Sequence, residues 1–163
     1  MASENSFDIV SRVDLQEVDN AVNQTLKEIS QRWDFKGSKV TLTREANVLT
    51  LGAEDDGKRR AVIGILSERL AGRHIPAKAL SFKDPAAASL GSVRQEIHLQ
   101  AGIDQDRAKE IVRRLKQSGL KVQPAIQGDQ VRVRGKNRDE LQAAIRLLRE
   151  AELDFDMQFT NYR

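Results

Sequence analysis

A chain of 163 residues can bury one full-sized hydrophobic core or two small ones, and the absence of cysteine excludes disulfides, thiolate nucleophiles and thiolate metal sites. Residues 1–6 lack the character of a secretion signal, and no apolar run approaches the roughly 18 residues that cross a membrane, so we expect a cytoplasmic protein with no membrane partner. The net charge of +3 lies entirely in residues 91–163, where 14 basic residues face 11 acidic ones, so an anionic partner is expected to prefer that half.

The first half of the chain predicts the order strand, helix, strand, strand, helix, strand. Asp14 and Glu17 form a capping-box pattern that opens an amphipathic helix, and its apolar stripe continues at steps of three and four residues to Trp33. Gly72 is a plausible end for the second helix. The predicted strands are residues 7–13, 39–44, 48–53 and 77–82. Residues 83–92 have loop composition and are interpreted as a linker or a long exposed turn.

The second half repeats this order. Asp104 and Asn137 are the predicted caps of its two helices, and Gly128-Asp129 is a hairpin turn between two of its strands. Its predicted strands are residues 93–100, 122–126, 130–134 and 157–162. A constant offset of 83 pairs like residues in the two halves, for example Val48 with Val131, which supports an internal duplication.

The predicted fold class is therefore α+β, with two tandem ferredoxin-like βαββαβ domains at residues 1–90 and 91–163. Each would form a four-stranded antiparallel sheet with both helices on one face and the other face open. A functional surface is expected on an open face.

Basic side chains alternate with apolar ones along residues 131–134. Burial of Val131 and Val133 under the helices would place Arg132 and Arg134 on the open face. Lys136 and Arg138 continue this basic run at the start of the last helix, where backbone N–H groups also favour an anion. The pattern indicates a phosphate site, although simple solvation of the sheet, or pairing with carboxylates, explains it about equally well.

Metal binding and catalysis find little support in the sequence. His98 is predicted to point outward, but no second histidine or cysteine stands at ligand spacing, so we expect no metal, no cofactor and no enzymatic activity. A His98–carboxylate pair on the open face offers acid-base chemistry in principle, and surface histidine is the simpler interpretation. The two predicted strands at residues 93–100 and 130–134 carry no aromatic residues, which disfavours a standard RNA-stacking platform.

Several motifs together resemble the bacterial YajQ family. These are Ser6-Phe7-Asp8-Ile9-Val10-Ser11, Arg32-Trp33-Asp34-Phe35-Lys36-Gly37, Ala53-Glu54-Asp55-Asp56, and the stretch from Gln127 to Val133. The resemblance implies tandem ferredoxin-like domains with exchanged N-terminal strands, so that residues 7–11 complete the second sheet and residues 93–99 the first. It also implies nucleotide binding, with cyclic di-GMP, GTP or RNA as the ligands.

The resemblance adds Phe35 and Lys36 to the predicted ligand-binding residues, and Tyr162 and Arg163 at the end of the last strand are further candidates. Trp33 and Phe35 are nevertheless predicted to be core residues, because Trp33 continues the apolar stripe of its helix. The leading hypothesis is a cytosolic effector that binds cyclic di-GMP or another guanine nucleotide and then engages a protein of the transcription or translation apparatus. The alternative is an RNA-binding module that grips the phosphate backbone. The nine predicted residues are Phe35, Lys36, His98, Arg132, Arg134, Lys136, Arg138, Tyr162 and Arg163.

Overall fold

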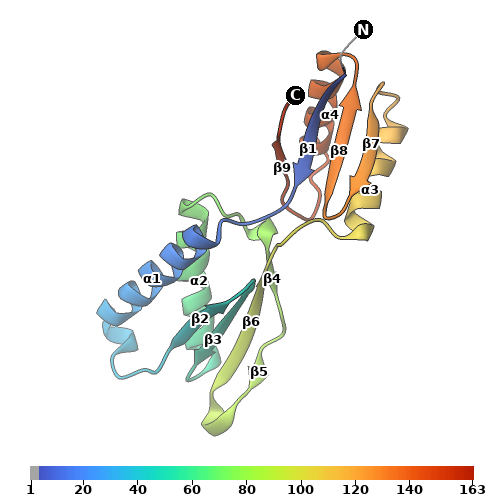
Figure 1. The fold of residues 1–163 in the computed structure, drawn as a ribbon. Helices are drawn as coiled ribbons and strands as arrows, with labels where there is room; N and C mark the ends of the chain where they lie inside the picture. The colour runs from blue at the N-terminus through green and yellow to red at the C-terminus, as the bar shows by residue number, and fades with distance from the viewer. Residues whose placement is uncertain (1–3) are drawn as a thin grey trace. The chain divides into compact units, whose positions relative to one another are not determined.

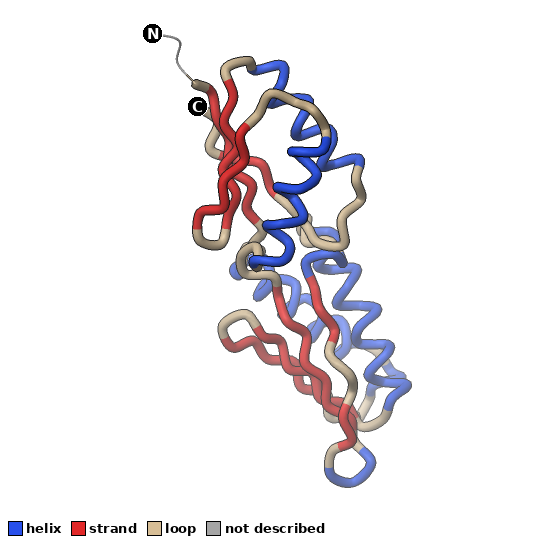
Figure 2. Tube along the Cα trace, turned by 90° about the vertical axis from the view of Figure 1, so that its right-hand side faces the viewer, coloured by secondary structure: helices blue, strands red, loops and turns tan. Residues whose placement is uncertain are grey.

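A computed structural model describes residues 4–163, which fold into two compact units of the α+β class (Figure 1). The central unit consists of residues 13–100. The terminal unit combines residues 4–12 with residues 101–163. Each unit has two α-helices, which Figure 2 shows on one side of its antiparallel sheet.

The sheet of the central unit has the strand order β2-β3-β6-β4, with the short β5 paired to β6. Its elements are α1 (Leu15–Gln31), β2 (Thr41–Glu45), β3 (Val48–Ala53), α2 (Asp56–Gly72), β4 (Leu80–Phe82), β5 (Ala86–Ala87) and β6 (Val93–Leu99). The apolar stripes of both helices pack on alternate residues of the strands, including Leu49, Leu51 and Ile97, all fully buried.

The sheet of the terminal unit has the order β7-β8-β1-β9. Its elements are β1 (Asn5–Val10), α3 (Gln105–Gln117), β7 (Gln123–Gln127), β8 (Gln130–Gly135), α4 (Arg138–Glu150) and β9 (Gln158–Thr160). Phe7 and Ile9 from β1 lie in one core with Val131 and Val133 from β8. The predicted fold class is confirmed.

The first strand of each repeat belongs to the sheet of the other repeat. β1 lies between β8 and β9, with Ser6 opposite Arg134, and β6 lies between β3 and β4, with Ile97 opposite Leu49. The exchange that the family resemblance implies is therefore present. The compact units consequently differ from a division of the chain near residue 90, because each takes a central strand from the other repeat.

The three predicted N-terminal helix caps are present, whereas the second helix has Arg73 rather than Gly72 as its C-cap. Asp14, Asp104 and Asn137 each accept backbone N–H groups of the first helical turn with their side-chain oxygens, which offsets the unpaired donors there. Residues 83–92 do not link the two units, because β4 and β6 on either side of this segment belong to the same sheet. The segment instead forms an exposed hairpin extension whose Ala86 and Ala87 pair with β6.

Candidate functional site

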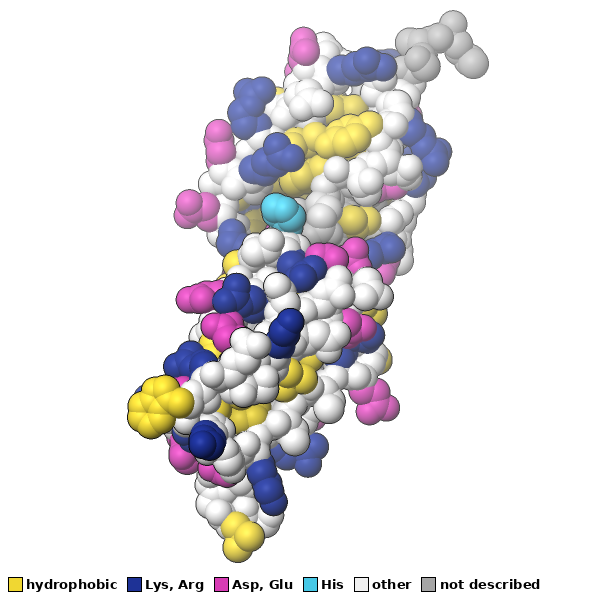
Figure 3. Space-filling model, turned by 90° about the vertical axis from the view of Figure 1, so that its left-hand side faces the viewer, with side chains coloured by type: hydrophobic (Ala, Val, Ile, Leu, Met, Phe, Trp, Pro, Cys, Tyr) yellow, Lys and Arg dark blue, Asp and Glu magenta, His cyan; other side chains and the backbone are white. Residues whose placement is uncertain are grey.

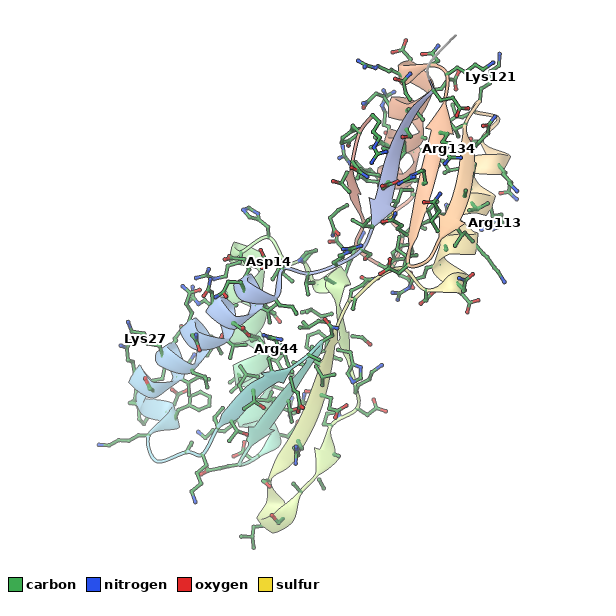
Figure 4. All side chains as sticks on the ribbon, viewed as in Figure 1. Asp14, Lys27, Arg44, Arg113, Lys121 and Arg134 are labelled. Carbon is green, nitrogen blue, oxygen red and sulfur yellow. The ribbon has the colours of Figure 1, made fainter. Side chains whose placement is uncertain are left out.

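The predicted alternation along β8 is present in the structure. Val131 and Val133 are fully buried, whereas Arg132 is partly exposed and Arg134 is exposed on the opposite face of the sheet. Both helices cover the valine side of the sheet (Figure 1), so the two arginines stand on the open face of the terminal unit; Figure 4 labels Arg134 on β8.

Arg132 is paired with a carboxylate. Its Nε donates to Asp8 Oδ1 at 2.8 Å, and Asn161 donates to the same carboxylate at 2.7 Å. Asp8 is 3% exposed. The Arg132 hydrogen bonds hold the pKa of Asp8 below its ordinary value, against the opposing effect of burial, with Asn161 acting in the same direction as Arg132. The expectation that both arginines stand uncovered in water is therefore wrong for Arg132, because β1 brings a buried acid directly opposite it.

Arg134 lies in the next row of the open face and takes part in none of the ion pairs among residues 4–163. Its direct neighbour on β1 is Ser6. The backbone of Ser6 pairs on its other side with Arg163, through two hydrogen bonds of 3.1 and 2.9 Å. Two exposed arginines thus flank one serine across three adjacent chain segments, so their positive charges reinforce each other.

The start of α4 adds further donors beside this row. Arg138 is the first residue of the helix, and its Nε reaches Asn5 Oδ1 at 3.4 Å, while Asn5 donates to the carbonyl of Lys136 at 3.2 Å. We call Arg134, Lys136, Arg138 and Arg163 the basic end of the terminal unit. All four are exposed.

A groove of about 300 Å³ lies between α4 and the segments that carry Ser6 and Arg163, next to the basic end, and two of the four basic-end residues line it. Arg138 and Arg163 line it together with the ring of Tyr162, which is 57% exposed and lies 6.3 Å from the Phe7 ring. The remaining lining residues are Asn5, Ser6, Leu141, Gln142 and Ile145. The groove therefore combines an apolar floor and an aromatic ring with two guanidinium groups, a composition typical of small-molecule sites.

The other predicted residues lie on the central unit. Phe35 is 5% exposed in the core, as predicted, and Lys36 is exposed beside it. His98 lies on the open face of the central sheet, with Nε2 3.0 Å from Glu96. The structure thus brings six of the nine predicted residues into the terminal unit and three into the central unit.

The prediction that Trp33 is a core residue is wrong. The helix ends at Gln31 because Arg32 adopts an extended conformation, and a 3₁₀ turn follows at Trp33–Phe35. This turn sends Phe35 into the core and leaves Trp33 88% exposed. The regular spacing of the apolar stripe gave no signal of the break.

The central unit carries a larger groove, of about 900 Å³, on its open face. Threonine hydroxyls from β2 and β3 form its floor, and its basic residues Lys39 and Arg94 are offset by Glu54 and Asp55. Its net charge is thus balanced, so the basic end of the terminal unit is the better candidate for an anion despite its smaller groove.

Two further observations concern the described part of the chain. No helix of residues 4–163 is long and apolar enough to cross a membrane. Within the same residues, no three His, Cys, Asp or Glu side chains are grouped closely enough to hold a metal ion.

The structure defines a protein of tandem ferredoxin-like units with a cluster of exposed basic side chains at the basic end. Residues 5–163 match the family described as "Nucleotide-binding protein YajQ-like", and the chain belongs to this family. It is 54% identical to a nucleotide-binding protein of Alkaliphilus oremlandii over the full length of both chains. It is also 54% identical to one of Trichlorobacter lovleyi, over 97% of this chain and 98% of that one. The resemblance of the sequence motifs is thereby confirmed, and both names are those of binding proteins.

Proposed function

We propose that this chain binds cyclic di-GMP or another guanine nucleotide at the basic end of the terminal unit. It performs no chemistry on the ligand and acts in the cytoplasm as an effector, whose bound form engages a protein of the transcription or translation apparatus. The observation that carries this proposal is the pair Arg134 and Arg163, which flank Ser6 on the open face without a carboxylate partner among the described residues.

The side chains of the basic end suit a phosphate ligand. A guanidinium binds two phosphate oxygens at once through parallel N–H donors, which makes arginine the preferred residue for this task. The N-terminus of α4 adds its positive dipole next to Arg138. Arg132 does not take part, because its charge is already paired with Asp8.

The groove supplies a place for the base. Tyr162 offers a ring face beside the two guanidinium groups, and Leu141 and Ile145 provide apolar contact. A volume of about 300 Å³ is at the small end of ligand sites, so it holds one base of a dinucleotide while the phosphates lie along the arginines.

Calorimetry with cyclic di-GMP tests the proposal. The double variant Arg134→Glu with Arg163→Glu is expected to lose at least about 100-fold in affinity, because each charged hydrogen bond contributes about 1.5–3 kcal/mol. The matched control is Lys109→Glu with Lys116→Glu, which makes the same charge change at exposed positions of α3. The control is expected to bind normally, and both variants are expected to keep the circular-dichroism melting curve. Unaltered binding in the arginine variant would remove the site assignment.

RNA-backbone binding is the alternative for the same residues, since the basic end forms a row as well as a groove. The dependence of affinity on salt concentration and on oligonucleotide length distinguishes RNA-backbone binding from a dinucleotide site. Backbone binding weakens steeply with salt and strengthens with oligonucleotide length, whereas a dinucleotide site saturates at a fixed stoichiometry. A ligand that binds only the folded protein stabilises it by about 2.7 kcal/mol at a concentration of about 100 times its Kd. If neither cyclic di-GMP nor RNA raises the melting temperature at such a concentration, both binding proposals are refuted.

A further inference from the structure

Trp33 is the only tryptophan of the chain and stands almost fully in water. Its 88% exposure contrasts with the 5% exposure of Phe35, two residues further on. Tryptophan is highly buried on average, so an indole that is almost fully exposed is unusual. The aromatic pairs and cation–π contacts of residues 4–163 involve other rings, so the faces of the indole have no such partner in this part of the chain.

The turn that carries the indole is firmly held. Lys36 N–H donates to the Trp33 carbonyl at 3.0 Å, and the Arg32 guanidinium makes two hydrogen bonds to Asp34, at 3.1 and 3.0 Å. Phe35 anchors the turn in the core, and Lys58 from α2 lies 4.8 Å from the centre of its ring. A ring on such a support loses little backbone freedom when it binds a partner.

The surroundings of Trp33 are positively charged. Residues 27–39 contain four basic and two acidic residues. The two acidic residues are occupied, since Glu28 pairs with Arg69 and Asp34 with Arg32. Lys27 and Lys36 are exposed and make no ion pair within residues 4–163, whereas Lys39 lies beside Glu54, whose carboxylate accepts its backbone N–H at 3.1 Å. Figure 4 shows Lys27 on α1, and Figure 3 shows basic and acidic side chains interspersed over the face that it draws.

We propose that Trp33 is a stacking anchor for single-stranded nucleic acid. A base lies against the indole, and the adjoining phosphates are contacted by the exposed lysines, Lys36 first because it closes the same turn. A polymer fits better than a mononucleotide, because a ring that projects from the surface covers only one face of a single base. A chain of nucleotides adds contacts to both Lys36 and Lys27, which are separate in space from the ring.

The single tryptophan makes the test direct. Intrinsic fluorescence of the full chain is titrated with single-stranded oligouridylates of about 4 and about 12 nucleotides, with a duplex of the longer length, and with GMP. Stacking is expected to quench the emission with the single strands, more tightly for the longer one, and weakly with the duplex, whose bases are already stacked. Equal affinity for GMP and the longer strand would overturn the assignment to a polymer.

Variants separate stacking from general apolar or charge effects. Trp33→Leu is expected to weaken binding of the longer strand by about 5- to 150-fold, and Trp33→Phe by much less, since only the latter keeps a ring. Binding is followed here by anisotropy of a labelled strand. The control Leu90→Ala removes another fully exposed apolar side chain and is expected to bind normally. Equal affinity of Trp33→Leu and the unchanged protein, or a loss as large in Leu90→Ala, would refute the anchor. The charge reversals at Arg134 and Arg163 test cyclic di-GMP binding by the terminal unit, whereas the Trp33 variants test binding of a single strand by the central unit. Either proposal can therefore fail without the other.

Discussion

Replacing Asp8 by alanine tests the ion pair that joins β1 to β8 within the terminal unit. The Asp8 carboxylate is 3% exposed and accepts hydrogen bonds from Arg132 at 2.8 and 3.2 Å and from Asn161 at 2.7 Å. Removing one member of a fully buried pair costs about 3–5 kcal/mol, because the other charge stays buried without compensation. The Arg132 side chain is 24% exposed and keeps some access to water. We therefore expect Asp8→Ala to lower the free energy of unfolding by about 2–3 kcal/mol.

The loss is expected to depend on pH. The folded-state pKa of Asp8 is lowered from its ordinary value of 3.8, first by the Arg132 hydrogen bonds. A carboxylate of lowered pKa contributes stability that is complete above the unfolded-state pKa and is lost as the pH falls through the folded-state value. The difference between the unchanged protein and Asp8→Ala is therefore expected to be constant near neutral pH and to shrink once the pH falls below about 4.

Urea denaturation followed by circular dichroism measures both effects. The control is Asp129→Ala in the same unit, where the pair with Arg12 is long, at 3.9 Å, and both side chains are more than half exposed. Such pairs contribute little to stability. The reasoning is refuted if Asp8→Ala costs no more than Asp129→Ala, or if its cost persists undiminished in acid.

Two further predictions concern the backbone. Gly64 lies in the exposed middle of α2 with open space around it, so Gly64→Ala is expected to raise the free energy of unfolding by about 0.5–1 kcal/mol. Gly52→Ala is expected to lower the free energy of unfolding by about 1–2 kcal/mol, because the new Cβ would lie 2.5 Å from the Thr41 hydroxyl. Urea titration checks both, and a Gly52→Ala loss that Thr41→Ala does not relieve contradicts the steric account. The fragment 13–100 is expected to melt cooperatively by itself, while 101–163 needs β1 between β8 and β9 and is expected to fold only when a peptide of residues 4–12 is added. Cooperative melting of 101–163 without the peptide argues against that role for β1.

Local signals predicted most of the elements correctly. The caps at Asp14, Asp104 and Asn137 depend on contacts within one helical turn, and the alternation of Val131 and Val133 reflects the pleat of a single strand. The predicted helices and strands therefore agree with the observed ones except near their ends, whereas the short β5 and the 3₁₀ turn at Trp33–Phe35 were not predicted.

Two site predictions depended on contacts that no local pattern contains. The partner of Arg132 is 124 positions away in the chain, and nothing in the run around Asp8 distinguishes it from a solvent-exposed acid. Trp33 continued the spacing of the helix in front of it, but Phe35 took the place in the core and the helix ended early. Trp33 and Phe35 are only two residues apart, so the sequence alone does not determine which of the two rings is buried.

The amino-acid sequence by itself determined the succession of helices and strands, the inward faces of these elements and the excess of positive charge near the chain's end, because each of these is a property of neighbouring residues. Only the tertiary structure decided which sheet each repeat's first strand joins, which arginine keeps an unpaired charge and which aromatic ring faces water. These depend on pairings between distant strands and on competition for space in a core, and both are settled only when the chain packs.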